Sequence, residues 1–269
     1  MKAMKRRLIG LCMALAALAN GNAQTQEELW IKNGERNIYG VLSRPENGAK
    51  KQPVAIISHG FNGTHHFGKD YFAMLAEKGY QCYTLDFPGG SMNSRSDSNT
   101  MNMSIKNEVD DLLAVVRYFK SRPDVDSKRI VLIGESQGGL VSALAASSKA
   151  KDISQLVLIY PALCIPDNWN ERYPDVAAIP DTTRMWNVPL SRNFFMELRD
   201  MDPYRELPKY KKPVLIIHGD ADPVVPISYS HRAVDAYKKV HLEVIEKAGH
   251  GFKPQERNKA IEWIREFLK

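Results

Sequence analysis

Gly134-Glu135-Ser136-Gln137-Gly138 lies between two apolar segments of the chain. The residues just before it, RIVLI, have the β-branched character of a buried strand, and those just after it, GLVSALAA, favour a helix. A strand, a G-x-S-x-G turn and a helix together are typical of a nucleophile elbow, a sharp turn that lifts its serine out of the sheet. The glycines fit because a Cβ would clash in so tight a turn. A plain loop serine is the alternative, and the flanking strand and helix disfavour it.

A serine needs a base and an orienting acid before it can act as a nucleophile at neutral pH. His250 lies in the sequence KAGHGF, after a strand-like run that ends at Ile245, so we expect it in a loop at the end of a strand. Asp222 lies in HGDADPVVP, at the end of the buried strand-like run PVLII. We predict that His250 is the base and Asp222 the acid; an exposed loop histidine is the alternative for His250.

Two carboxylates share the loop after that strand. We predict Asp222 as the acid because the Asp222-Pro223 step fixes the chain just past the turn. Asp220 is expected to cap the turn through its own backbone instead, and His218 to be structural. The remaining histidines show no pattern of partners and are expected in surface or loop positions: His65, His66, His231 and His241.

Residues 53–63, PVAIISHGFNG, form another apolar strand that ends in a loop with two glycines. A site for acyl transfer needs backbone N–H groups aimed at the oxyanion that develops in the reaction. One donor is expected from Gln137, the residue after the nucleophile, and the other from Phe61 in this loop. His59 is expected to support the loop rather than to act as a second base. An ordinary turn is the alternative for this segment.

Taken together, these segments resemble the α/β-hydrolase superfamily and, within it, bacterial cinnamoyl (feruloyl) esterases and their monoacylglycerol-lipase-like relatives. The resemblance covers roughly residues 36–269, and the chain order serine, aspartate, histidine is that of this fold. It implies Ser136 as nucleophile, His250 as base, Asp222 as acid, and Phe61 and Gln137 as oxyanion donors. The motifs that carry it are HGF at 59–61, GESQGG at 134–139, HGDADPVVP at 218–226 and GHGF at 249–252.

Two stretches depart from the pattern of these relatives. They commonly carry histidine where this chain has Glu135, and the sequence DFPGGS at 86–91 replaces their usual Gly-His-Gly-x-Ser run. Neither departure touches the three catalytic candidates. We therefore expect both to affect the pocket and its substrate rather than the type of reaction.

The first 23 residues read as a secretory signal peptide. Four basic residues precede an apolar run over 8–19, and Gly21-Asn22-Ala23 offers a cleavage site. The run is too short for a membrane span, and Leu11 before Cys12 disfavours a lipoprotein. We expect cleavage near Ala23 and a secreted or periplasmic protein; an intact N-terminus on the exported chain, measured by mass spectrometry, would contradict this.

The charge balance and the cysteines exclude several classes of protein. The formal net charge of +6 falls to +2 without residues 1–23, because these hold four of the 37 basic residues and no acidic one. The remaining basic residues are scattered, so we expect no nucleic-acid partner.

Cys82 and Cys164 lie in or beside apolar strands and are expected to be buried free thiols. No cluster has metal-ligand spacing, and no cofactor or metal is expected.

Strand-like and helical segments alternate along residues 24–269, which predicts one α/β domain with a mostly parallel, doubly wound sheet. Active groups then gather at the carboxyl ends of the strands. The predicted strands are at 38–43, 53–58, 80–86, 129–134, 155–160, 213–218 and 241–245. The predicted helices are at 70–78, 104–120, 138–148, 228–239 and 254–268.

Residues 161–208 interrupt this alternation. They contain no clear strand pattern but many prolines and aromatic residues, so we predict a lid insertion over the site. Trp186, beside Met185, is the best candidate for a substrate-binding wall of the pocket. The alternative for each aromatic residue is that it only packs the lid onto the domain.

These patterns predict a serine carboxylester hydrolase that acts on a small-molecule ester through an acyl-enzyme, with feruloyl, cinnamoyl or acetyl esters of plant-polymer fragments as the expected substrates. Monoacylglycerols and short peptides are the other substrate classes. The short lid without a long apolar run disfavours the first, and the lack of a propeller-sized N-terminal domain disfavours the second. A non-catalytic binding protein with the same fold is the alternative from another class, and it would need an incomplete set of catalytic residues.

Overall fold

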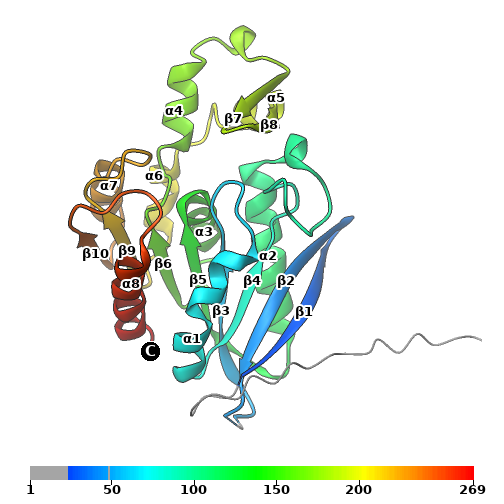
Figure 1. Ribbon diagram of the computed structural model, residues 1–269, viewed down its shortest axis with the longest axis vertical. Coiled ribbons are helices and arrows are strands. Elements are labelled where there is room, and N and C mark those ends of the chain that lie inside the picture. Colours follow the sequence, from blue (N-terminus) through cyan, green and yellow to red (C-terminus); the bar gives the residue numbers. More distant parts are fainter. Residues whose placement is uncertain (1–23, 48) are drawn as a thin grey trace, which may run out of the picture.

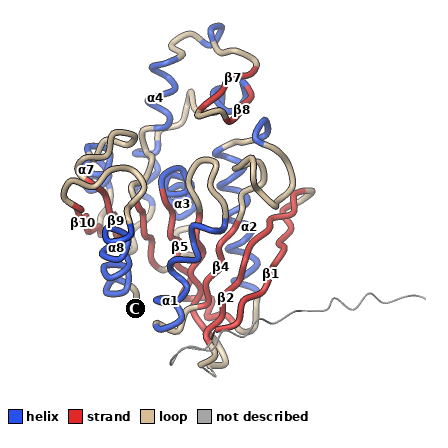
Figure 2. The backbone as a smooth tube through the Cα atoms, viewed as in Figure 1, coloured by secondary structure: helices blue, strands red, loops and turns tan. Residues whose placement is uncertain are grey.

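The computed structural model describes residues 24–47 and 49–269, so the predicted signal peptide lies outside the described residues. An eight-stranded sheet forms the centre of the protein, in the order β1-β2-β4-β3-β5-β6-β9-β10 (Figures 1 and 2). Its strands are β1 (Gln24–Asn33), β2 (Arg36–Pro45), β3 (Gln52–Ser58), β4 (Gln81–Leu85), β5 (Val125–Glu135), β6 (Gln155–Ile159), β9 (Val214–Gly219) and β10 (Val240–Ile245).

The sheet is parallel from β4 to β10, and β1 and β2 add an antiparallel edge. Helices cover both of its faces (Figure 1), with α1 (Phe72–Glu77) and α8 (Pro254–Phe267) on one and α2 (Ile105–Ser121), α3 (Ser136–Ser148) and α7 (Ser228–Ala236) on the other. The mostly parallel, doubly wound sheet that the sequence predicted is therefore confirmed.

Both faces of the central strands are buried, which explains why these strands read as unbroken apolar runs. In β5, Ile130 and Leu132 pack with α2 and α3, whereas Val131 and Ile133 pack with α1 and α8. The same alternation recurs in β3, β6 and β9. Such a strand cannot slip by one residue without exchanging its two faces, so the positions of its ends are well determined.

The chain leaves β3 and β5, which are neighbours, in opposite directions. After β3 it continues to β4 on one side, and after β5 it continues to β6 on the other. Ligands of open α/β sheets bind at such a switch point, outside the carboxyl ends of the strands. In this protein the loop after β3 begins at His59 and helix α3 begins directly after β5, at Ser136.

Three strands were absent from the sequence prediction, which also placed no helix in residues 161–208. Strand β1 is mostly exposed at the edge of the sheet and carries polar residues, so it has no apolar run to reveal it. The other two strands, β7 (Thr182–Met185) and β8 (Val188–Ser191), form a hairpin in residues 161–208, where no strand was expected. Its strands have four residues each, and its turn residues Trp186 and Asn187 both have positive φ, as the commonest two-residue hairpin turns require.

The hairpin belongs to a segment that lies above the carboxyl edge of the sheet (Figure 1). We call residues 161–208 the insertion. It also contains the helices α4 (Ile165–Arg172), α5 (Arg192–Glu197) and α6 (Pro203–Glu206), with single 3₁₀ turns at η3 (Val176–Ala178) and η4 (Leu207–Lys209). Among all helices of the described residues, none is long and apolar enough to cross a bilayer.

Candidate active site

Ser136 stands at a strained turn between β5 and α3. Its φ of +48° lies in the left-handed region, which non-glycine residues rarely occupy. The glycines of the motif allow the turn to close. A Cβ on Gly134 would come within 2.2 Å of the Gly138 carbonyl oxygen, and a Cβ on Gly138 within 2.4 Å of the carbonyl oxygen of His59. The elbow therefore packs directly against the end of β3, next to the loop that was expected to face it.

Ser136, His250 and Asp222 form a continuous hydrogen-bonded relay. His250 Nε2 lies 3.0 Å from Ser136 Oγ, and its Nδ1 lies 2.8 Å from Asp222 Oδ2. An ionised carboxylate can only accept, so Nδ1 carries the hydrogen and Nε2 is free to accept the serine proton. Three loops that are 28 and 86 residues apart along the chain thus meet in the geometry of nucleophile, base and acid.

The Asp222 carboxylate is buried and bonded on both oxygens. Oδ1 accepts hydrogen bonds from the backbone N–H groups of Val224 (2.8 Å) and Val225 (2.9 Å), whereas Oδ2 faces His250 Nδ1 at 2.8 Å and His218 Nε2 at 3.3 Å. His218 lies behind it and is fully buried, with Nε2 2.9 Å from the Val225 carbonyl and Nδ1 2.7 Å from Ser230 Oγ. Burial lowers the pKa of His218, so this histidine supports the turn as a neutral group.

Two sequence expectations in this region were wrong. Asp220 does not cap its own turn: its Oδ1 accepts from the backbone N–H of Lys247, 2.6 Å away, and so ties down the loop that carries His250. His65 is not a surface residue but is buried, with Nδ1 2.8 Å from Asp86 Oδ1. Both partners lie far away in sequence, and a local pattern therefore gives no sign of them.

The loop after β3 brings Phe61 to the same pocket as Ser136. The Gly60 carbonyl belongs to the same peptide group as the Phe61 N–H, and it accepts from His59 Nδ1 (2.7 Å) and from the Gly63 N–H (3.0 Å). His59 Nε2 in turn accepts from the backbone N–H of Phe87 at 3.1 Å. His59 therefore supports the loop, and burial lowers its pKa and keeps it neutral.

The N–H groups of Phe61 and Gln137 have no hydrogen-bond acceptor among residues 24–47 and 49–269. Gln137 is the second residue of α3 and lies in its first turn, where backbone N–H groups have no partner within the helix. Both donors are thus available to a bound group at the switch point. Backbone N–H groups without a partner are the kind of donor that can stabilise a developing oxyanion.

Two carboxyl groups lie next to the site. Sequence analysis assigned no role to Glu108 and expected Glu135 to affect the pocket, but Glu135 is not among the residues that line the pocket. Glu135 accepts from the Gly60 N–H (3.2 Å) and from the Tyr160 hydroxyl (2.7 Å), and burial raises its pKa to about 7. Glu108 of α2 is buried and accepts from Gln137 Nε2 at 2.9 and 3.0 Å. Burial raises the pKa of Glu108 to about 8. The position of Glu135 inside the elbow motif is the one sequence signal that could have revealed such a role.

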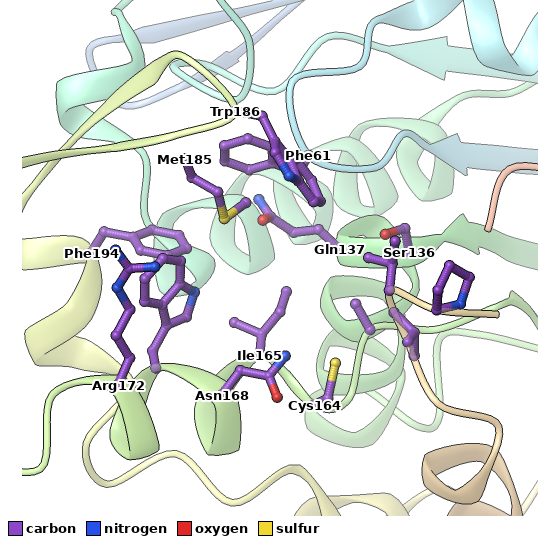
Figure 3. Close-up of a pocket in the computed structure, with 15 residues that line it drawn as sticks. Phe61, Ser136, Gln137, Cys164, Ile165, Asn168, Arg172, Met185, Trp186 and Phe194 are labelled. Atoms are coloured by element: carbon purple, nitrogen blue, oxygen red, sulfur yellow. The ribbon is translucent and has the colours of Figure 1, made fainter.

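A pocket of about 330 Å³ opens in front of Ser136 (Figure 3). Its walls are mainly apolar, and they come both from the loops at the sheet edge and from the insertion. Asn168 and Arg172 supply polar groups on the insertion side, across the pocket from Ser136 (Figure 3). The lining residues from the insertion are Ala162, Cys164, Ile165, Asn168, Trp169, Arg172, Met185, Trp186 and Phe194.

Trp186 lies at the tip of the β7–β8 hairpin and projects toward the loop after β3. Its ring packs edge-to-face on Phe61 with centroids 5.8 Å apart, and 67% of the residue is exposed. Phe195, by contrast, is buried and packs on Trp169 with ring centroids 4.7 Å apart. The aromatic residues of the insertion therefore divide into those that line the pocket and those that only hold the insertion together.

Cys82 and Cys164 are both free and buried. Within the part of the chain that the structure describes, no three His, Cys, Asp or Glu side chains are grouped as a metal site would need.

The fold and the relay together define a serine hydrolase of the α/β-hydrolase class. The model of the prolyl oligopeptidase family matches residues 65–269, and the chain belongs to this family.

Solved structures support the same class. Est1E from Butyrivibrio proteoclasticus, determined with ferulic acid bound, is 29% identical, covers 89% of this chain and 97% of its own, and superposes with a TM-score of 0.82. A monoacylglycerol lipase from Paleococcus ferrophilus is 18% identical, covers 86% of this chain and 98% of its own, and has a TM-score of 0.65, which shows a shared fold.

Curated relatives include peptidases. The uncharacterized peptidase YtmA of Bacillus subtilis is 20% identical over 89% of this chain and 91% of its own length. The acylamino-acid-releasing enzyme of Rattus norvegicus is 22% identical over 88% of this chain. This chain spans 35% of that enzyme and 36% of YuxL, another uncharacterized peptidase of Bacillus subtilis.

Proposed function

We propose that the protein hydrolyses carboxylic esters through an acyl-enzyme on Ser136. The observation that carries this proposal is the relay from Ser136 Oγ through His250 to Asp222, with bonds of 3.0 and 2.8 Å. His250 takes the serine proton as Oγ attacks the carbonyl, and Asp222 holds the imidazole in the required tautomer and stabilises its positive form. The N–H groups of Phe61 and Gln137 stabilise the oxyanion, an effect worth several kcal/mol in comparable sites. His250 then protonates the leaving alcohol, and water releases the acyl group; the reaction needs no cofactor.

Esters of aromatic acids, such as feruloyl or cinnamoyl esters from plant polymers, are the substrates we propose. The pocket suits them because Phe61 and Trp186 offer aromatic surfaces near the nucleophile, while Asn168 and Arg172 offer polar partners for a phenolic oxygen across the pocket. The likeness to Est1E with bound ferulic acid supports the same choice. With the leader described above, we propose that the protein acts outside the cytoplasm.

Cleavage of short peptides is the second candidate, and membership of the prolyl oligopeptidase family favours it. The same relay can attack an amide as well as an ester, so geometry at Ser136 does not separate the two. A panel of substrates does. Rates on acetyl, butyryl and feruloyl esters, a monoacylglycerol and an acyl-peptide p-nitroanilide rank the classes directly. A higher kcat/KM on the anilide than on every ester would replace the ester proposal.

Ser136→Ala is the decisive variant for the catalytic role. We expect hydrolysis of p-nitrophenyl acetate to fall by about 10³-fold or more, and labelling by a fluorophosphonate probe to disappear. Ser147→Ala, on the same helix but bonded to the Ala143 carbonyl, is the matched control and should keep wild-type activity. Wild-type activity in Ser136→Ala would defeat the proposal, and a wild-type protein that neither labels nor hydrolyses the panel would favour a binding protein with this fold.

A further inference from the structure

Glu135 is the residue between the first glycine of the elbow and the nucleophile; it is not among the residues that line the pocket, and its carboxylate has two hydrogen-bond partners. Oε1 accepts from the Gly60 N–H at 3.2 Å, and Oε2 accepts from the Tyr160 hydroxyl at 2.7 Å. One partner belongs to the loop after β3 and the other to the segment after β6. The carboxylate thus connects three neighbouring strand ends at the switch point.

The bond to Gly60 helps to hold the loop after β3, which carries Phe61 and is called the oxyanion loop below. Gly60 directly precedes Phe61, and the elbow is so close that a Cβ on Gly60 would lie 3.1 Å from the Cβ of Ser136 and 3.5 Å from Glu135 Oε1. His59 and Gly63 already hold the carbonyl of Gly60. With its N–H bonded to Glu135, Gly60 is held on both sides, and this fixes the direction of the next N–H, that of Phe61.

The bond to Tyr160 bears on the base. The Tyr160 ring lies against the imidazole of His250, with centroids 4.7 Å apart, and its backbone is held at φ +34°. The ring also packs edge-to-face on Phe252, two residues beyond His250, at 4.7 Å. By accepting from the hydroxyl, Glu135 fixes the surface on which the imidazole rests.

We propose that Glu135 is a positioning residue for two parts of the site, the oxyanion loop and the imidazole of His250. Its ionised form holds both in the correct position relative to Ser136. This inference rests on the proposed ester hydrolysis. Charge-assisted hydrogen bonds are about twice as strong as neutral ones, so protonation of this carboxyl weakens both contacts at once. The protein therefore loses activity as this carboxyl becomes protonated.

The surroundings of Glu135 set the pH at which this happens. Burial is the largest influence and raises its pKa to about 7, against the opposing effects of the bonds to Tyr160 and Gly60 and of the Arg257 guanidinium on α8. Tyr71 of η1 (His65–Tyr71) also faces it and is neutral, because burial raises the pKa of that phenol far above the working range. Below about pH 7 the carboxyl is protonated, so the loss occurs as the pH falls.

Kinetics of Glu135→Gln and Glu135→Ala against pH test the inference. With p-nitrophenyl acetate over roughly pH 5–9, we expect Glu135→Ala to lower kcat about 10–100-fold while KM changes less than about threefold. Glu135→Gln keeps the shape and one acceptor oxygen, so a fall of about 3–10-fold is expected at high pH. When log kcat is plotted against pH, the slope on the acid side should be greater than one for the wild type and equal to one for Glu135→Gln.

Tyr160→Phe provides a second route, because it removes only the hydroxyl that Glu135 accepts. We expect a fall in kcat of about 3–5-fold, and no further fall when it is combined with Glu135→Ala. Tyr80→Phe is the matched control, since the Tyr80 hydroxyl is bonded to the Lys269 carbonyl at the other end of the molecule. Thermal unfolding of each variant shows whether it is folded.

Unchanged kcat and an unchanged acid limb in folded Glu135→Gln and Glu135→Ala would overturn the inference. A rise in KM with constant kcat would also overturn it, because it would indicate a contact with substrate. Failure of the proposed function looks different: the wild type itself would be inactive, or Ser136→Ala would remain active.

Discussion

The carboxyl edge of the sheet and the insertion form two walls of one pocket, and they are built in different ways. At the sheet edge, Ser136 and Asp222 follow strands that are paired on both sides and buried on both faces. In the insertion, Met185 and Trp186 stand on a hairpin of four-residue strands that pairs with no strand of the main sheet. A polar link, in which Glu197 accepts from Ser104 and from the Ile105 N–H, and a cluster of buried aromatic rings attach this segment to the domain.

This difference indicates that the sheet edge determines the type of reaction and that the insertion determines the preference for substrates. A proton relay tolerates errors of only about 0.5 Å, and strand ends locked in register meet this demand. Apolar walls tolerate larger changes, because contacts with a substrate are spread over many atoms. Substitutions at the sheet edge should therefore change kcat on every substrate, whereas substitutions in the insertion should change the ranking of substrates.

Asp222→Asn should give the largest effect. The amide oxygen will remain on the N–H groups of Val224 and Val225, so the amide NH₂ will face His250 and donate to Nδ1. His250 then carries its hydrogen on Nε2 and cannot accept the proton of Ser136. We expect kcat to fall about 10³–10⁴-fold on every ester tested.

Asp220→Asn is the matched control for that variant. It lies in the same loop and keeps an acceptor for the Lys247 N–H, so its kcat should stay within about threefold of the wild type. If Asp222→Asn kept more than a tenth of wild-type activity, the relay would not be the catalytic machinery.

Glu108→Gln should change stability in a pH-dependent way. In the folded protein the pKa of Glu108 is about 8, above its ordinary value near 4.5, so the folded state holds the proton more tightly than the unfolded state. The wild type therefore loses stability as the pH rises from about 4.5 to about 8. Glutamine carries no charge, and its amide can donate to Gln137 Oε1, a buried atom without a partner among the described residues.

We expect the free energy of unfolding of Glu108→Gln to exceed that of the wild type by roughly 1–3 kcal/mol at about pH 9, and by much less near pH 5. Urea unfolding at both pH values measures the difference. An equal difference at the two pH values would mean that ionisation of Glu108 is not the cause.

Trp186→Ala should give the smallest effect and the most selective one. The indole is exposed at the mouth of the pocket and packs on Phe61, so its loss removes a wall without opening the core. We expect kcat/KM for methyl ferulate to fall about tenfold, and kcat/KM for p-nitrophenyl acetate to change less than about threefold.

Trp30→Ala is its matched control, because Trp30 is a half-exposed tryptophan on β1 that packs on Tyr39 at the edge of the sheet. It should leave both rates unchanged. An equal loss on the two substrates in Trp186→Ala would place this residue with the catalytic machinery rather than with the pocket wall.

Most of the central sheet could be predicted from sequence, because each of its inner strands carries its own signal. Strands β3, β5, β6 and β9 each contain an apolar run of at least four residues and are separated by helical segments. Strand β1 and the β7–β8 hairpin could not be predicted, since partly exposed strands need no apolar run. The three members of the relay could be named for a related reason: each stands in a short motif beside a strand end.

Local sequence thus determined the inner strands of the main sheet, the elbow and the residue types of the relay, because backbone sterics and apolar burial act over a few neighbouring residues. Packing in three dimensions settled the rest. It placed Glu135 against Gly60 and Tyr160, turned Asp220 toward Lys247, buried His65 on Asp86, and brought the hairpin over the pocket. A hydrogen bond depends on the distance between two atoms, and for residues 20 to 80 positions apart that distance is set by the fold as a whole.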